Sequence, residues 1–212
     1  MAPLISVIVP TYNRTRLLTQ RALPSVFAQT VQDQEILVVG DGTSPATVRA
    51  IAEEHRVTFW NRKHPVYPDD EEDRWKVIGL EALNDAIDRA KGEWIAVLAD
   101  DDEWLPNHHE VLLDIAERSG ADHVYGKSET WKAGKRTPQT YGEWPPLGPG
   151  HFCNGANLYR RELCSRFHYR YDLDCLARGK PGDEDLWERM VLGGVTFAFT
   201  PITVHRYHRH YP

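Results

Sequence analysis

Short apolar runs alternate with longer amphipathic stretches through the first 120 residues, and this alternation is the clearest pattern in the chain. Continuous apolar runs of this length predict buried strands, here over residues 5–10, 35–39, 57–60 and 94–99. Apolar residues at helical spacing predict helices between them, over residues 15–30, 45–52, 77–91 and 106–119. Strands that alternate with helices favour a parallel sheet with right-handed crossovers, which is an α/β fold.

Local signals mark where several of these elements start and stop. Ser44 is a good N-cap and Pro45 a good first residue for the second helix. Pro24 interrupts the first helical pattern and is expected to kink or split that helix. Gly120 is expected to end the fourth helix. Residues 61–75, basic at first and then acidic, are interpreted as an irregular loop that either carries binding groups or is simply solvated.

The second half of the chain has a less regular pattern. Strands are expected over residues 122–125, 195–199 and 203–205, with a hairpin or long loop over 131–152. A helix is expected to start at Pro181-Gly182-Asp183 and to end at Gly193-Gly194. Residues 153–163 give no clear prediction.

Three consecutive aspartates, Asp100, Asp101 and Asp102, come directly after the buried run that ends at Ala99. Their mutual repulsion is costly unless a cation or solvent offsets it. The carboxyl end of a parallel strand is where α/β proteins bind ligands, and carboxylates suit Mg²⁺ or Mn²⁺ that bridges to phosphates. The motif therefore predicts a metal–diphosphate site. The alternative is a solvated acidic turn that caps the next helix.

Composition narrows the function classes. The 212 residues fit one domain, and the net charge of −6 argues against a general binder of nucleic acid or anionic membranes. The cysteines Cys153, Cys164 and Cys175 cannot all pair with one another, so we expect reduced thiols in a cytoplasmic protein. No apolar run approaches transmembrane length and no signal peptide is visible at the start of the chain.

Several motifs follow one another in an order and spacing that carry more information than any one of them alone. They are Ser6 to Arg14, Ser25 to Thr30, Glu35 to Thr43, Leu83-Asn84, Ala90 to Ile95, Asp100 to Asp102, Asn154 to Leu163, Gly182 to Arg189 and His205 to His208. Together they resemble family 2 glycosyltransferases of the GT-A fold, over nearly the whole chain. The resemblance implies a Rossmann-like, mostly parallel central sheet flanked by helices.

The resemblance also implies roles for individual residues. The nucleotide-sugar site would include Pro10, Thr11, Tyr12, Arg14, Asp41, Asn84, Asp100 and Asp101. Asp100 and Asp102 would hold Mn²⁺ or Mg²⁺ on the diphosphate, with His208 as a further ligand. His205 is the alternative to His208, and a solvated tail is the alternative for this whole C-terminal motif. The chain departs from the family at Gly40 and Ala99, where many members carry an acidic residue, so Asp101 also remains a candidate metal ligand.

The implied reaction is inverting transfer of a sugar from a nucleoside diphosphate, UDP being the expected one, to a hydroxyl acceptor. Asp183 is the first candidate for the base and Asp185 the second, and mutual repulsion in Asp183-Glu184-Asp185 would raise one pKa. The alternative for Asp183 is a plain helix N-cap. One catalytic domain would span residues 1–212, with a nucleotide-sugar half over 1–120 and an acceptor half over 121–212.

Two other functions stay open from the sequence. A nucleotidyltransferase also uses carboxylate-held Mg²⁺, but it usually has a glycine-rich basic loop after the first strand, and Thr11 to Thr15 contains no glycine. A nucleotide-sugar-binding module without catalysis is the second alternative. The sugar, the acceptor and the oligomeric state are not predicted. Acceptor specificity is expected within residues 127–152, where Trp131, Tyr141 and Trp144 either stack on a sugar ring or pack under the loop.

Overall fold

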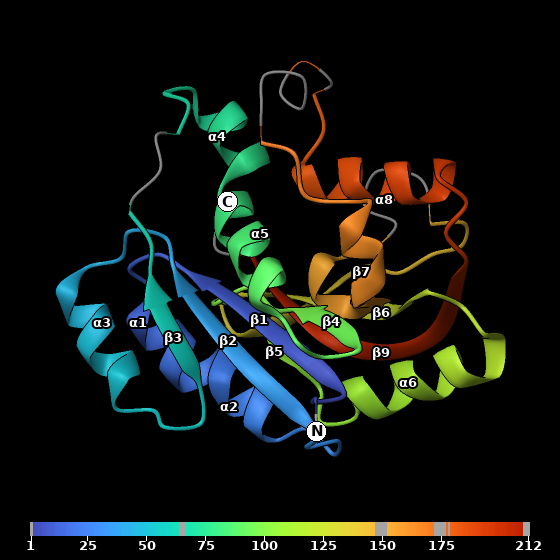
Figure 1. The fold of residues 1–212 in the computed structure, drawn as a ribbon, viewed down its shortest axis with the longest axis horizontal. Helices are drawn as coiled ribbons and strands as arrows, with labels where there is room; N and C mark the ends of the chain where they lie inside the picture. The colour runs from blue at the N-terminus through green and yellow to red at the C-terminus, as the bar shows by residue number, and fades with distance from the viewer. Residues whose placement is uncertain (1, 64–66, 147–151, 172–176, 178, 210–212) are drawn as a thin grey trace.

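One mixed β-sheet crosses the molecule from side to side, as Figure 1 shows in a computed structural model that describes residues 2–63, 67–146, 152–171, 177 and 179–209. The strands are β1 (Ile5–Thr11), β2 (Gln34–Gly40), β3 (Thr58–Asn61), β4 (Trp94–Val97), β5 (Glu103–Trp104), β6 (His123–Lys132), β7 (Lys135–Tyr141), β8 (Asn157–Arg160) and β9 (Phe197–Arg209). The helices are α1 (Thr15–Leu17), η1 (Leu18–Ala22), α2 (Leu23–Phe27), α3 (Pro45–Ala52), α4 (Glu71–Val77), α5 (Leu80–Arg89), α6 (His108–Ser119), η2 (Asn154–Ala156), η3 (Arg161–Ser165) and α8 (Gly182–Leu192).

The strand order is β3-β2-β1-β4-β8-β6-β9-β5, with β7 paired to β6. The first four of these, β3, β2, β1 and β4, run parallel, which confirms the predicted parallel sheet. Strand β8 is antiparallel to both β4 and β6, so the second half of the chain adds strands in mixed directions. Because β1 is parallel to both β2 and β4, the carboxyl ends of these three strands lie at the same edge of the sheet.

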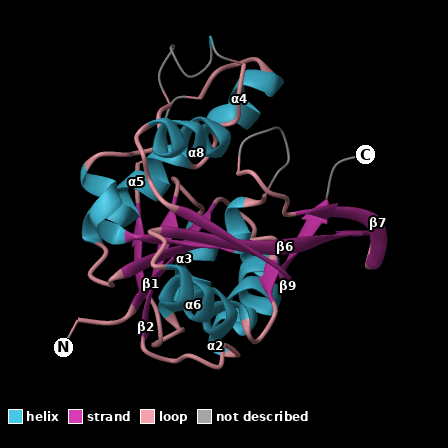
Figure 2. Cartoon of the chain, turned by 90° about the vertical axis from the view of Figure 1, so that its right-hand side faces the viewer, coloured by secondary structure: helices cyan, strands magenta, loops and turns pink. Residues whose placement is uncertain are grey.

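Helices cover both faces of the sheet (Figure 2). Alternate residues of β1 explain why: Ile8 packs into a core with α5 and α8, whereas Val7 and Val9 pack into a second core with η1, α2 and α6. A strand buried on both faces must be apolar at every position, which is the pattern seen in the sequence. The result is a three-layer arrangement with two cores.

The first helix is split, as the sequence predicts. The break is not confined to Pro24 but takes up the five residues of η1, Leu18–Ala22. Proline has no N–H and its ring crowds the preceding turn. The helix accommodates Pro24 by forming the π-helix η1 just before it, and the Leu23 N–H donates to the Leu18 carbonyl. Ser44 caps α3 and accepts a hydrogen bond from the Thr47 N–H, which confirms that prediction.

The predicted boundary between a loop over residues 61–75 and a helix over 77–91 is wrong. The structure has two helices here, α4 and α5. Asp70 caps a separate helix, α4, and accepts a hydrogen bond of 2.9 Å from the Asp73 N–H. The acidic run that suggested a solvated loop lies in the first turn of α4, where the helix dipole favours negative charge. Gly79, with a φ of 77°, separates α4 from α5.

Strand β9 also differs from expectation, because one strand replaces the two that were predicted. It pairs in parallel with β6 along most of its length and with β5 near its end. Pro201 interrupts the apolar pattern without ending the strand, and the register shifts between Tyr125 and Ser128 on β6. Cys153 and Cys164 are free thiols, as expected, and Cys175 lies outside the described residues. Within the described ranges, every helix is too short or too polar to span a membrane.

Candidate active site

The ends of β1, β2 and β4 bring three sequence motifs together. Thr11 lies opposite Gly40 in the β1–β2 ladder, and Ile8 lies opposite Val97 in the β1–β4 ladder. Because these strands are parallel and in register, the residues that follow each of them meet at one edge of the sheet. This is the place where open α/β sheets bind ligands.

The Asp100 carboxylate accepts hydrogen bonds from the motif at the end of β1, which contains Thr11 and Arg14. The Thr11 hydroxyl donates to Oδ2 of Asp100 at 2.7 Å, and Nη1 of Arg14 donates to Oδ1 at 3.2 Å. The same guanidinium nitrogen also contacts Oδ2 of Asp101, while Nη1 of Arg21 donates to the Asp101 carbonyl at 2.7 Å. Burial raises the pKa of Asp100 to about 6, against the opposing effect of Arg14. Arg14 thus offsets carboxylate charge that the sequence alone leaves unbalanced, and Arg21 brings a second positive charge to the Asp101 main chain.

Asp41 is buried at the start of the turn after β2. Its N–H donates to the Thr11 carbonyl at 2.9 Å, and the Tyr67 hydroxyl donates to its Oδ2. Nη1 of Arg62 lies 3.9 Å from its Oδ1. Burial and the bond to Asp41 raise the pKa of the Tyr67 phenol, so this group remains a donor at neutral pH. Sequence reasoning missed Arg62 and Tyr67, because both come from the segment interpreted as an irregular loop.

Asp102 is held by β9. The His208 N–H donates to Oδ1 of Asp102 at 2.7 Å, and Nε2 of His205 lies 3.4 Å from Oδ2. Nδ1 of His205 is 2.9 Å from the buried Ser128 hydroxyl. The His208 ring turns elsewhere, since its Nε2 lies 3.1 Å from Oε1 of Glu103. Of the two histidines, His205 therefore places its ring beside the acidic motif.

A cavity of about 460 Å³ connects this edge to the second half of the chain. Asp102 and Asp183 both line it, although 81 positions separate them in the sequence. The other lining residues are Pro10, Trp75, Lys76, Ile78, Leu80, Leu83, Val97, Ala99, Tyr141, Phe152, Cys153, Asn154, Gly155, Pro181, Gly182, Glu184 and Tyr207. The wall is thus mainly apolar and aromatic, with carboxylates at two places.

Helix α8 places Asp183 at this cavity. A Cβ atom on Gly182 would lie 2.2 Å from a methyl group of Leu80, so glycine allows α8 to start directly against α5. Pro181 is the N-cap residue of α8, and the Asp183 carboxylate accepts a hydrogen bond of 3.0 Å from the neighbouring Glu184 N–H. Asp183 is therefore not the N-cap that the alternative interpretation assumed. Burial, together with the Glu184 carboxylate, raises its pKa to about 6.

Asp185 has different surroundings, although it is only two residues away. It is fully buried, and its Oδ2 accepts a hydrogen bond of 2.7 Å from Nε of Arg189. The cluster that was expected to raise one pKa by repulsion is therefore split. Asp183 faces the cavity and Asp185 is paired with a cation.

The amino-acid sequence from residue 6 to residue 167 matches the family model described as glycosyl transferase family 2. The chain belongs to glycosyl transferase family 2. It is 30% identical over 146 residues to the GalNAc(5)-diNAcBac-PP-undecaprenol beta-1,3-glucosyltransferase of Campylobacter jejuni, covering 66% of this chain and 43% of that protein. It is 35% identical over 112 residues to the putative colanic acid biosynthesis glycosyl transferase WcaA of Escherichia coli, covering 52% and 37%. The chain thus spans less than half the length of these two relatives.

Solved structures show the same fold at low sequence identity. Residues 1–349 of S. aureus TarS in complex with UDP match with a TM-score of 0.75 at 16% identity, over 97% of this chain and 60% of that one. Mannosyltransferase PcManGT from Pyrobaculum calidifontis, in complex with GDP-Man and Mn²⁺, matches with a TM-score of 0.69 at 17% identity, over 100% and 58%. The predicted GT-A fold is confirmed.

Three other residues that the family resemblance assigns to the nucleotide-sugar site, Pro10, Tyr12 and Asn84, have different surroundings. Pro10 lines the cavity, and Tyr12 is 44% exposed after β1. The Asn84 amide donates to the Tyr169 carbonyl at 2.8 Å and accepts from the Tyr169 N–H at 3.0 Å, so it holds a loop in this structure. The nucleotide-binding roles of all three stay predictions.

The three aromatic residues expected near the acceptor differ in position. Tyr141 lines the cavity and its ring makes an edge contact with Tyr207. Trp131 packs under the Arg206 guanidinium, and Trp144 is 58% exposed. Trp75 of α4 is 56% exposed and also lines the cavity. No sequence pattern pointed to Trp75, since the helix that carries it was not predicted.

The residues fit a divalent cation of the kind that completes its shell with substrate oxygens. Within the described ranges, no group of three or more His, Cys, Asp or Glu side chains has metal-binding geometry. Mg²⁺, however, is commonly held by one or two carboxylates together with substrate phosphates. Asp102 offers such a carboxylate to the cavity, and Asp100 lies two residues before it in the chain.

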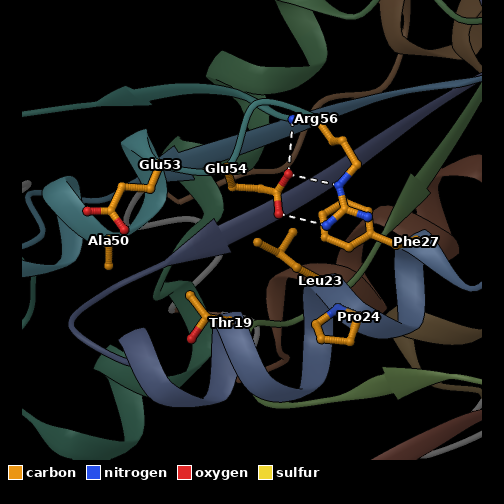
Figure 3. A pocket seen from close by; sticks show the side chains of 8 residues that line it. All are labelled: Thr19, Leu23, Pro24, Phe27, Ala50, Glu53, Glu54 and Arg56. Atoms are coloured by element: carbon orange, nitrogen blue, oxygen red, sulfur yellow. Dashed lines mark hydrogen bonds and ion pairs between the residues drawn. The ribbon is translucent and has the colours of Figure 1, made fainter.

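A second hollow, of about 480 Å³, lies between η1, α2 and α3 (Figure 3). Its lining residues are Thr19, Leu23, Pro24, Phe27, Ala50, Glu53, Glu54 and Arg56. Arg56 donates to both Glu54 oxygens, at 2.8 Å and 2.7 Å, and lies over the Phe27 ring. The Arg56 hydrogen bonds lower the pKa of Glu54 to about 2, so this carboxylate is no candidate base. Phe27 belongs to the family motif from Ser25 to Thr30, but none of the candidate donor, metal or base residues lines this hollow.

Proposed function

We propose that this domain transfers a sugar, with inversion, from a nucleoside diphosphate sugar to a hydroxyl acceptor, and that Asp183 is the base. The observation that carries the proposal is that Asp102 and Asp183 line one cavity. Family membership supports glycosyl transfer as the reaction class.

The donor would bind at the edge formed by β1, β2 and β4, within residues 1–120. Asp41 supports this assignment, because a buried carboxylate with donors around it can accept a further hydrogen bond from a base or ribose. Arg14 and Arg21 lie close to the same edge and bring positive charge near a diphosphate. UDP is our first choice of nucleotide, since TarS was solved with UDP and with UDP-GlcNAc.

Asp102, together with Asp100, would hold Mn²⁺ or Mg²⁺ near the diphosphate. Such an ion supplies a positive charge that stabilises the leaving diphosphate. The Mn²⁺ in the PcManGT complex supports this choice of ion. The contacts of His205 and His208 keep the Asp102 carboxylate in one orientation toward the cavity.

Asp183 would take the proton of the acceptor hydroxyl as that oxygen forms its bond to the anomeric carbon. The bond from the anomeric carbon to the phosphate oxygen breaks at the same time, and the nucleoside diphosphate leaves from the opposite face. A base works best when its pKa lies near the operating pH, and the raised pKa of Asp183 meets this condition. Asp185 fits the role less well, because its carboxylate is paired with Arg189.

The acceptor would enter beside Asp183, where Trp75, Tyr141 and Tyr207 also line the cavity. Aromatic faces bind the apolar face of sugar rings, so a glycan acceptor suits this cavity. Residues 127–152 would contribute through Tyr141, although residues 147–151 lie outside the described ranges.

The proposal is tested by incubating the protein with Mn²⁺, a mixture of simple sugar acceptors and single nucleotide sugars, and measuring free nucleoside diphosphate. Release of nucleoside diphosphate with one donor supports the proposal. Release of pyrophosphate from a nucleoside triphosphate and a sugar phosphate would favour a nucleotidyltransferase instead. Binding of a donor without release, under all acceptors, would favour a module without catalysis.

A further inference from the structure

The turn that carries Asp41 is fixed by two asparagines from neighbouring strand ends. Asn13, after β1, accepts at its Oδ1 from the Ser44 N–H at 2.8 Å, and its own N–H donates to the Thr43 hydroxyl at 2.9 Å. Asn61, the last residue of β3, also contacts this turn, at Thr43. Thr43 therefore has partners in both asparagines.

The Asn61 side chain pairs with the Thr43 main chain as a peptide group would. Its Oδ1 accepts from the Thr43 N–H at 3.0 Å, and its Nδ2 donates to the Thr43 carbonyl at 2.9 Å. Two hydrogen bonds to one residue fix both the position and the rotation of that residue. The side chain thereby continues the pairing of β2 with β3 beyond its last backbone partners, Gly40 and Asn61.

Gly40 makes room for this contact. A Cβ atom at position 40 would lie 2.5 Å from Oδ1 of Asn61 and 2.8 Å from the Thr43 methyl group. Any side chain at position 40 would therefore displace the Asn61 amide. This explains in physical terms a position at which the chain departs from many family members.

We propose that Asn61 is a positioning residue for donor binding: it locks the turn over residues 41–44 so that the Asp41 carboxylate faces the nucleoside, and Gly40 is its necessary partner. The inference rests on the proposed function, because it takes Asp41 as a donor contact. Asp41 itself is two residues from Thr43, and its N–H is already fixed to Thr11. Release of Thr43 therefore lets the backbone of the turn shift and carry Asp41 with it, although the Tyr67 hydroxyl still binds the Asp41 carboxylate.

The test compares Asn61→Ala with the wild type, using UDP and Mn²⁺ as the probe. Calorimetry should show UDP binding weakened about tenfold, the scale expected when a charge-assisted hydrogen bond is lost from alignment. With the donor that supports turnover, KM should rise by a similar factor while kcat changes less than twofold. Thr58→Ala on the exposed face of β3 is the matched control and should bind UDP as the wild type does.

Two further measurements separate positioning from a general loss of structure. The Thr43 amide should exchange with solvent faster in Asn61→Ala, with the melting temperature near that of Thr58→Ala. Gly40→Ala should weaken UDP binding in the wild type, and the loss should be smaller in the Asn61→Ala background, because the displaced group is already gone.

These experiments distinguish a failure of the proposed function from a failure of the positioning role of Asn61. If the wild type binds no nucleoside diphosphate, the proposed function and this inference both fail. If Asp41→Ala weakens UDP binding while Asn61→Ala does not, only the inference fails. Unchanged exchange of the Thr43 amide, or full additivity of Gly40→Ala and Asn61→Ala, would also overturn it.

Discussion

Nε2 of His205 lies 3.4 Å from Oδ2 of Asp102, and the opposite ring nitrogen lies 2.9 Å from the Ser128 hydroxyl. Strand β9 thus reaches the acidic motif through a buried side chain. This relationship places the C-terminal part of the chain within the candidate active site. It also indicates that the orientation of the Asp102 carboxylate depends on residues of β9 that are far from it in sequence.

Metal removal gives the first prediction. We expect UDP to bind much more weakly after EDTA treatment, because the diphosphate then meets the Asp102 carboxylate without a neutralising cation. Calorimetry with and without Mn²⁺ measures this difference. Equal affinity under both conditions would contradict the metal assignment.

Asp102→Asn should abolish metal-dependent turnover and leave the fold intact, since the side chain keeps its shape and can still accept from the His208 N–H. Circular dichroism and the melting temperature check the fold. Asp114→Asn, on the exposed face of α6, is a suitable control for the loss of one carboxylate. Full turnover by Asp102→Asn would remove this residue from the mechanism.

Asp41→Ala should raise the UDP dissociation constant about tenfold or more. The expected loss is one hydrogen bond to a charged group, roughly 1.5–3 kcal/mol. The variant also removes the acceptor of the Tyr67 hydroxyl, which still accepts from the Gly79 N–H, so Tyr67→Phe is the necessary comparison. If both variants bind UDP as the wild type does, the turn has only a structural role.

The pH dependence follows from Asp183. Its pKa is raised to about 6, so the carboxyl group gains a proton as pH falls through this value and can no longer act as a base. We expect kcat to be constant above about pH 7 and to fall about tenfold per pH unit well below 6. The residual activity of Asp183→Asn should lack this inflection. A wild-type profile that is flat from pH 5 to 8 would argue against a carboxylate base.

Asp185→Asn should lower stability rather than activity. The buried carboxylate loses its charge-assisted bond to Arg189, which costs about 1–3 kcal/mol in the free energy of unfolding. Asp114→Asn removes a comparable but exposed pair with Arg118 and should cost less than about 0.5 kcal/mol. Denaturant unfolding compares the two. Equal costs would mean that burial adds nothing to the Asp185 pair.

Local patterns in the sequence predicted the elements that carry the donor site. The strands before Thr11, Gly40 and Asp100 are continuous apolar runs, and their parallel order follows from the helices between them. Helix α4 was missed because its first turn is almost wholly acidic, which is typical of a solvated loop unless the cap at Asp70 is recognised.

The contacts between distant residues were beyond the sequence pattern. Arg14 reaches two aspartates more than 80 positions away, and Asn61 pairs with Thr43 only because β2 and β3 adopt one register. Hydrophobic periodicity says nothing of such polar pairs. The difference between Asp183 and Asp185 also depends on helix rotation, which places one at the cavity and the other against Arg189.

The transfer rate of Asp183→Asn, measured beside Asp185→Asn with saturating donor and acceptor, tests the proposed mechanism most directly. Asparagine keeps the shape of the side chain but cannot accept the acceptor proton, so Asp183→Asn should retain UDP binding and lose roughly 100-fold or more in kcat. Asp185→Asn should keep kcat within a few fold at a temperature where it remains folded. Full activity of Asp183→Asn, with or without loss of activity in Asp185→Asn, would contradict the assignment of Asp183 as the base.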